Sequence, residues 1–142
     1  MVITIDTNVL YQALSSNLGA SFRILQLIRK GNFKLAISQS VFSEYVDVLT
    51  RPTSLNYFEL KQSDVENILR YIAYISEKYD PKFLFRPNLK DENDNMFVEL
   101  AIVSQSRFLI TNNIKDFISG ELIFDNFELV TPSEFLWRQL NG

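Results

Sequence analysis

The sequence has no cysteine and no histidine among its 142 residues. The first absence excludes disulfides, thiolate zinc sites and thiol catalysis, and it leads us to expect a cytoplasmic protein. The second excludes imidazole general bases, serine–histidine triads and the usual zinc and copper ligands. Any metal ion must therefore be a hard cation that is bound through oxygen atoms.

Long apolar runs and a strong charge imbalance are missing as well. No run reaches the roughly 18 apolar residues of a membrane span, and no basic segment followed by an apolar core suggests a secretory signal. We therefore expect no membrane contact. The formal net charge is −3, so a nucleic acid would have to be attracted by a local basic patch or by bound metal. Length and composition are typical of one globular domain covering residues 1–142.

Short apolar segments alternate with helical patterns along the chain. The expected strands cover residues 2–5, 33–37, 83–85, 108–111 and 127–130. The expected helices cover residues 21–31, 39–50, 63–78 and 91–106, and TPSE at 131–134 opens a last helix. Residues 51–62 are expected to form a loop, after which Ser63 and Glu66 have the spacing of a capping box. This alternation predicts an α/β fold whose parallel sheet is covered on both faces.

The carboxyl ends of these strands are the expected position of a ligand site. Asp6 directly follows the first strand, and residues 111–113 follow the fourth. No basic residue adjoins Asp6, and a buried carboxylate without a partner is costly. Either the chain turns out to solvent at Asp6, or a cation lies there.

Two further acids occupy positions on apolar helical stripes. Glu44 shares a stripe with Val41 and Tyr45, and Asp94 precedes Phe97 on another. The simpler interpretation places Glu44 at the edge of its stripe, in contact with water. It likewise assigns Asp94 to capping at the positive end of its helix.

The three acids together favour a metal site. Asp6, Glu44 and Asp94 would repel one another in a shared pocket, so that their pKa values would rise unless a cation balanced them. Mg²⁺ or Mn²⁺ is the natural partner of carboxylates and water, and such an ion acidifies water without the help of histidine. The hypothesis depends on the three carboxylates converging at one edge of the sheet.

Three stretches of this sequence resemble the motifs of the PIN-domain ribonucleases, and among them the VapC-like toxin components of type II toxin–antitoxin pairs. VITIDTNVL resembles the opening strand with its first metal-binding Asp, here Asp6. SQSVFSEYVDVLTRP resembles the second motif and aligns its Glu with Glu44. RPNLKDENDNMFVELAIVSQSRFLITNN resembles the third and fourth motifs, with Asp94 as the third acid and Thr111 and Asn113 at the next strand's end.

The resemblance implies a PIN-like three-layer α/β/α sandwich with a central parallel sheet of about five strands. It implies metal-dependent cleavage of single-stranded or looped RNA with one or two Mg²⁺ or Mn²⁺ ions, frequent homodimers and inhibition by a cognate antitoxin protein. The metal ligands would be Asp6, Glu44 and Asp94. Asn113 would complete the catalytic set, although it replaces the acid of many members and so puts a second ion in doubt.

Supporting roles remain open between chemistry and plain structure. Residues that would act around the ligands, or else cap helices and form turns, are Thr7, Asn8, Asp91, Thr111 and Asp116. Four cations would contact RNA phosphates: Arg51, Arg86, Lys90 and Lys115. Arg51 could instead pair with a surface acid, and the other three could form a solvated surface. Tyrosines such as Tyr57 and Tyr71 would stack on bases or else pack against helices.

Two alternatives differ in chemistry. A degenerate PIN scaffold would bind RNA or protein without catalysis. A phosphatase-like domain would use Asp6 as its nucleophile, but it would want a second acid two residues later, where Asn8 stands.

Overall fold

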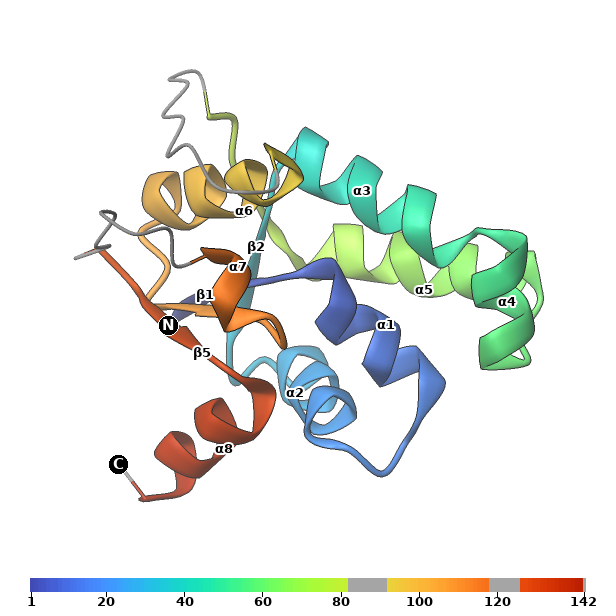
Figure 1. Cartoon of the computed structure of the whole chain (residues 1–142), viewed down its shortest axis with the longest axis horizontal. Coiled ribbons are helices and arrows are strands. Elements are labelled where there is room, and N and C mark those ends of the chain that lie inside the picture. Colours follow the sequence, from blue (N-terminus) through green and yellow to red (C-terminus); the bar gives the residue numbers. More distant parts are fainter. Residues whose placement is uncertain (82–91, 118–125, 142) are drawn as a thin grey trace.

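The computed structural model describes residues 1–81, 92–117 and 126–141, in which helices and strands alternate (Figure 1). The strands are β1 (Val2–Ile5), β2 (Lys34–Ile37), β3 (Glu77–Lys78), β4 (Phe108–Ile110) and β5 (Glu128–Val130). The helices are α1 (Thr7–Ser15), α2 (Ala20–Arg29), α3 (Gln39–Leu49), α4 (Pro52–Phe58), α5 (Gln62–Ile75), α6 (Glu92–Val103), α7 (Ile114–Phe117) and α8 (Pro132–Asn141). These five strands form one parallel sheet in the order β3-β2-β1-β4-β5. The predicted α/β fold with a parallel sheet is confirmed.

The sheet register brings the ends of β1 and β4 together. Ile3 pairs with Leu35 of β2 on one side and with Phe108 of β4 on the other. One residue beyond β1, the backbone N–H of Asp6 still donates to the carbonyl of Ile110 at 2.9 Å. Polar residues that follow β1 and β4 therefore lie at the same carboxyl edge.

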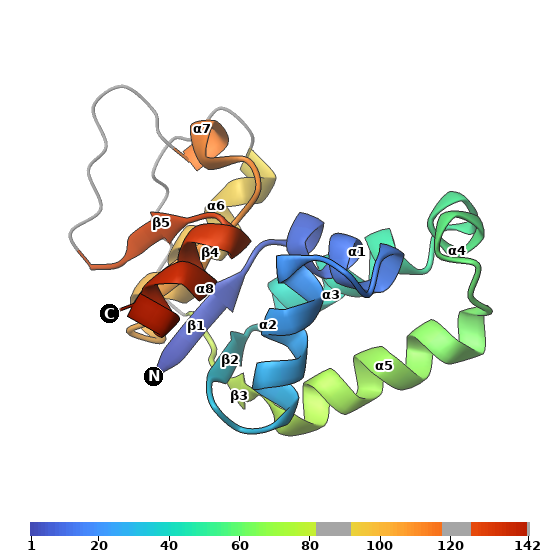
Figure 2. The same cartoon turned by 90° about the horizontal axis from the view of Figure 1, so that it is seen from below.

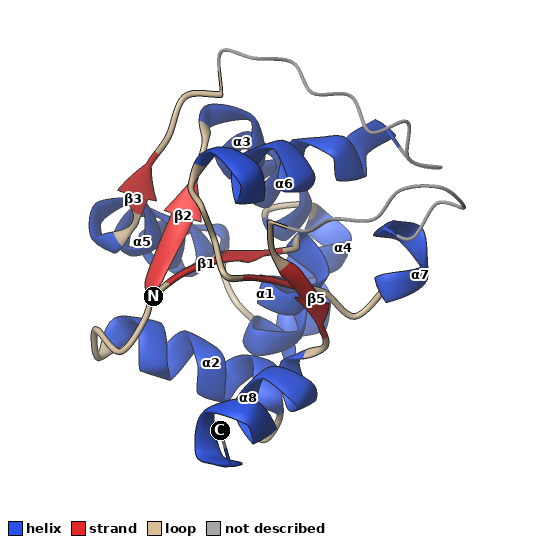
Figure 3. Ribbon diagram, turned by 90° about the vertical axis from the view of Figure 1, so that its left-hand side faces the viewer, coloured by secondary structure: helices blue, strands red, loops and turns tan. Residues whose placement is uncertain are grey.

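Helices cover both faces of the sheet. Figure 3 shows α3 and α6 above the strands and α2 and α8 below them. The core is aromatic on the lower side, where the Phe135 ring meets the rings of Phe33 and Phe108 edge-on at centroid distances of 5.0 and 5.3 Å. Figure 2 shows α4 at the end of the molecule opposite β5. None of the helices in the described ranges has both the length and the hydropathy needed to cross a bilayer.

Several local expectations were wrong. Residues 51–62 do not form a plain loop, because Pro52 ends one helix and also opens α4, where its missing N–H costs nothing. The following helix stops at Ile75, and Glu77–Lys78 pair with β2 as a strand. At the start of α5 the backbone N–H of Lys61 donates to Asp64 at 3.1 Å, in place of the expected pair of Ser63 and Glu66.

Other boundaries agree with the sequence or lie beyond the description. The hydroxyl of Thr131 accepts a hydrogen bond from the backbone N–H of Glu134 at 3.2 Å and so caps α8 as predicted. The expected strand at 83–85 lies outside the described residues. Helices α1 and α7 had not been predicted, since their segments follow strands directly and carry short apolar patterns.

Candidate active site

The carboxylate of Asp6 lies at the centre of the candidate site. Its residue is only 7% exposed, at the junction of β1 and α1. One carboxylate oxygen, Oδ2, accepts hydrogen bonds from Thr111 Oγ1 at 2.7 Å and from Asn8 Nδ2 at 3.1 Å. Burial raises the pKa of Asp6 above its ordinary value, and the Thr111 hydrogen bond offsets only part of that rise. Of the two alternatives that the sequence leaves open for Asp6, the turn out to solvent is excluded.

The segment after β4 is tied to Asp6 through side-chain amides and a hydroxyl. Asn8 Oδ1 accepts from the backbone N–H of Asn112 at 3.2 Å and from its Nδ2 at 3.3 Å. Thr111 Oγ1 accepts from the backbone N–H of Asn113 at 3.0 Å while it donates to Asp6. Asn8 and Thr111, which the sequence places around the ligands, are therefore direct hydrogen-bond partners of Asp6. Asn112 had been placed at this edge without a role, and only the fold shows that it holds Asn8.

Two further acids lie within electrostatic range of Asp6. The negative charges of Glu44 and, more weakly, Asp116 raise the pKa of Asp6 in addition to burial. Glu44 is half-buried on α3, next to the fully buried Tyr45. Asp116 lies in the short helix α7, where a turn or loop had been expected. The structure thus brings acids from three distant parts of the chain into electrostatic contact.

Asp94 is half-buried in the first turn of α6. Within the described ranges, no three acidic side chains lie close enough to hold a metal ion between them. Mg²⁺ is usually held by one or two carboxylates and several waters, so a three-acid cage is not a requirement. A buried carboxylate with excess negative charge beside it, in an all-oxygen setting, fits a hard divalent cation. Asp6 and Glu44 are the donors that would hold it first.

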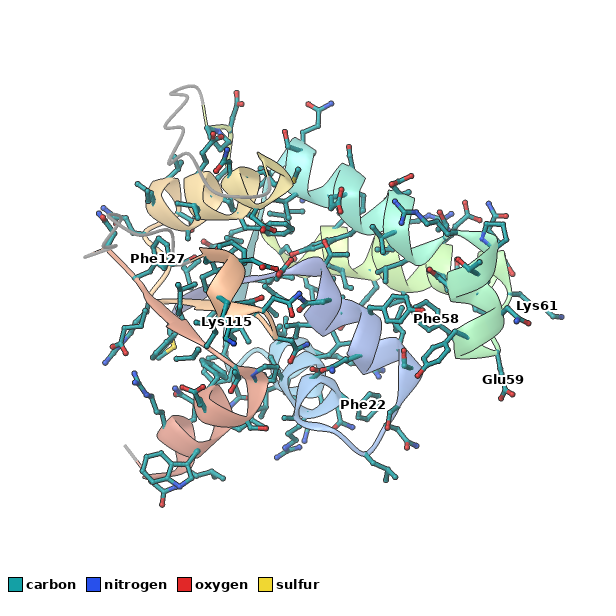
Figure 4. All side chains as sticks on the ribbon, viewed as in Figure 1. Phe22, Phe58, Glu59, Lys61, Lys115 and Phe127 are labelled. Carbon is teal, nitrogen blue, oxygen red and sulfur yellow. The ribbon has the colours of Figure 1, made fainter. Side chains whose placement is uncertain are left out.

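The remaining candidate residues differ in their surroundings. The Thr7 hydroxyl is buried and has no hydrogen-bond partner among the described residues, whereas the side chain of Asn113 is exposed. Arg51 forms an exposed ion pair with Asp47 at 2.8 Å, which is the structural one of its two expected roles. Figure 4 shows Lys115 on α7, and its side chain is exposed. Three candidates lie outside the described residues: Arg86, Lys90 and Asp91.

The aromatic residues of α4 take part in packing. The Tyr11 ring stacks on the Tyr57 ring at 5.8 Å and meets the Phe58 ring edge-on at 4.8 Å. Figure 4 shows Phe58 between α1 and α4. Between α2 and α5, the guanidinium carbon of Arg29 lies 5.9 Å from the ring centre of Tyr71.

Comparisons with known proteins agree with this arrangement. The crystal structure of VapBC2 from Rickettsia felis, bound to a DNA fragment from their promoter, is similar to this chain with a TM-score of 0.63. The two are 22% identical, and the match covers 92% of this chain and 98% of the other, so the fold is what this likeness shows. No curated protein matches the chain. The PIN domain family matches residues 2–115. Because that match extends over most of the sequence, the protein belongs to the PIN domain family.

Proposed function

We propose that the protein is a divalent-metal-dependent endoribonuclease that hydrolyses RNA phosphodiester bonds. The observation that carries the proposal is the buried Asp6 carboxylate, whose pKa is raised by burial and by the nearby charges of Glu44 and Asp116. Excess negative charge at the carboxyl edge of a parallel sheet favours a cation there, and a cation in turn favours a phosphate. Membership of the PIN domain family supports nuclease chemistry at this edge.

The chain's own residues would each have a defined task. Asp6 and Glu44 would hold Mg²⁺ or Mn²⁺, with Asp94 and Asp116 as further acids and water completing the coordination. Thr111 and Asn8 both donate to Oδ2 of Asp6 and so fix the orientation of its carboxylate. When bound, the ion would acidify water and neutralise charge on the phosphate. Asn113 adds no charge, so one ion accounts for the site better than two.

We further propose that the protein is the toxin of a toxin–antitoxin pair. The similar solved structure is a VapBC2 complex, which supports a cognate antitoxin protein as partner. A homodimer working in the cytoplasm is part of the same proposal. Light scattering of the purified protein measures its mass in solution, and co-purification with the product of a neighbouring small gene tests the antitoxin.

RNA cleavage with and without metal tests the catalytic proposal. The wild-type protein is incubated with a structured RNA in Mg²⁺, in Mn²⁺ and in excess EDTA, beside Asp6→Asn and Glu44→Gln. Asp47→Asn is the matched control, because Asp47 is an exposed acid on the same helix as Glu44. We expect the wild type and the control to cleave the RNA in Mg²⁺ or Mn²⁺ and not in EDTA. Cleavage by Asp6→Asn, or by the wild type in EDTA, would contradict the mechanism.

A second candidate is a PIN scaffold that binds RNA or protein without cleaving it. The observation in its favour is that no three acids of the described part of the chain lie at metal-holding distance. Calorimetry with Mn²⁺ separates the two candidates, since the nuclease must bind the ion and the scaffold need not. Asn8 donates to Asp6 where a phosphatase would need an acid, so no observation favours the phosphatase.

A further inference from the structure

Tyr45 connects the two acids that would hold the cation. It follows Glu44 on α3, is 0% exposed, and its ring lies 6.4 Å from the Phe97 ring of α6. Its hydroxyl donates to the backbone carbonyl of Ile5 at 2.5 Å. That carbonyl belongs to the peptide bond between Ile5 and Asp6. One hydrogen bond therefore joins the residue after one acid to the peptide before the other.

The same peptide is held on its other side. The backbone N–H of Asp6 donates to the carbonyl of Ile110 at 2.9 Å. A peptide unit is planar, so a hydrogen bond at its oxygen and another at its nitrogen determine its orientation. That orientation sets the direction in which the Asp6 side chain leaves the backbone.

Packing alone does not account for the hydroxyl of Tyr45. A phenylalanine would fill nearly the same space, and a buried phenol needs a hydrogen-bond partner. Burial, and after it the charge of Asp6, raises the pKa of Tyr45, so that the hydroxyl remains a proton donor to the carbonyl.

We propose that Tyr45 is a positioning residue: its hydroxyl holds α3 against the Ile5–Asp6 peptide and so sets the separation of the Glu44 and Asp6 carboxylates. The inference rests on the proposed function, because it takes both carboxylates as ligands of the cation. Partners that orient metal ligands typically change metal affinity or activity about 10- to 100-fold when they are removed.

Thr4 offers a matched control for a purely structural role. It is 0% exposed on β1, and its hydroxyl lies 2.8 Å from that of Ser106. Thr4→Val removes one buried hydroxyl from β1, and Tyr45→Phe removes one from α3, which is hydrogen-bonded to the end of that strand. Ser106 keeps the hydroxyl of Ser104 at 2.7 Å as a partner. Any general effect of losing a buried hydroxyl bond should therefore appear in both variants.

The test compares wild type, Tyr45→Phe and Thr4→Val by three measurements. Calorimetry with MnCl₂ gives the metal affinity, RNA cleavage gives kcat and KM, and amide hydrogen exchange without metal reports on the Asp6 N–H. We expect Tyr45→Phe to bind Mn²⁺ about tenfold more weakly or worse. We also expect it to lower kcat with little change in KM, and to exchange the Asp6 amide faster. Thr4→Val should match the wild type in all three measurements.

Mn²⁺ binding by Tyr45→Phe as tight as that of Thr4→Val would overturn the inference. An equal loss of Mn²⁺ affinity in both variants would overturn it as well. An unchanged exchange rate of the Asp6 amide in Tyr45→Phe would refute the claim that the Tyr45 hydroxyl holds this peptide, and that measurement needs no metal. If the wild type itself neither binds Mn²⁺ nor cleaves RNA, the proposed function fails first and the inference falls with it. The wild-type measurements thus distinguish that failure from a failure of Tyr45 alone.

Discussion

The substitution Asp6→Asn should stabilise the protein in the absence of metal. In the presence of metal, the same variant should be less stable than the wild type. The carboxylate is 7% exposed, and burial together with Glu44 and Asp116 raises its pKa. Burying a charge costs several kcal/mol, and each hydrogen bond to it returns about 1.5–3 kcal/mol. Because the pKa is raised, the cost of burying the charge exceeds the stabilisation that its hydrogen bonds provide. We expect Asp6→Asn to stabilise the metal-free protein at pH 7 by on the order of 1 kcal/mol, or about 3 °C in Tm.

The sign of the pH dependence follows from linkage. A carboxyl group whose pKa is raised by folding contributes stability that is complete below its ordinary value of 3.8. That contribution is lost as the pH rises through the raised pKa of the folded state. In EDTA, the advantage of Asp6→Asn should therefore grow from acid toward neutral pH and vanish below the ordinary pKa.

Metal should invert the order of the two proteins. An ion that binds only the folded state at about 100 times its Kd adds about 2.7 kcal/mol. The wild type should gain this stability in MnCl₂, and Asp6→Asn should gain little. Urea unfolding at pH 7 in EDTA and in MnCl₂ measures both differences. Asp47→Asn is the control, and it should shift stability by less than about 0.5 kcal/mol because its ion pair with Arg51 is exposed.

Two outcomes would refute this reasoning. If Asp6→Asn is less stable than the wild type in EDTA at every pH, the carboxylate is not buried at a net cost. If Mn²⁺ stabilises Asp6→Asn as much as the wild type, Asp6 is not a ligand of the ion.

Three further predictions concern the hydrogen bonds, the core and the surface. Thr111→Val removes a buried donor to Asp6 and should lower the free energy of unfolding at pH 7 by about 1.5–3 kcal/mol in urea titrations. Phe135→Ala should cost about 3–5 kcal/mol in the same titrations, because the ring is fully buried against two others. Arg51→Ala should change both stability and RNA cleavage little, since its partner is a surface acid. A large loss of cleavage in that variant would instead assign Arg51 to phosphate binding.

The sequence by itself determined the two central strands β1 and β4 and the edge of the sheet at which the candidate site lies. The apolar run Val2–Ile5 ends at a charge, and the run at Phe108–Ile110 ends at a threonine; the structure has both strands with these bounds or one residue shorter than predicted. Such patterns are local, because each strand is recognised from a few consecutive apolar residues that become buried together. Parallel strands share a carboxyl edge, so the approach of Asp6 to Thr111 followed from topology before any distance was known.

Only the tertiary structure decided which side chains meet at that edge. Thr111 and Asp6 are 105 positions apart, and their hydrogen bond depends on the register of β1 against β4. The sequence leaves Asp116 open between a role at the site and a place in a turn, and the structure puts it in a short helix where its charge acts on Asp6. The bond from Tyr45 to the Ile5 carbonyl spans 40 positions, and periodicity marks that tyrosine only as core. Contacts of this kind depend on how helices pack on the sheet, and no local pattern in the chain encodes them.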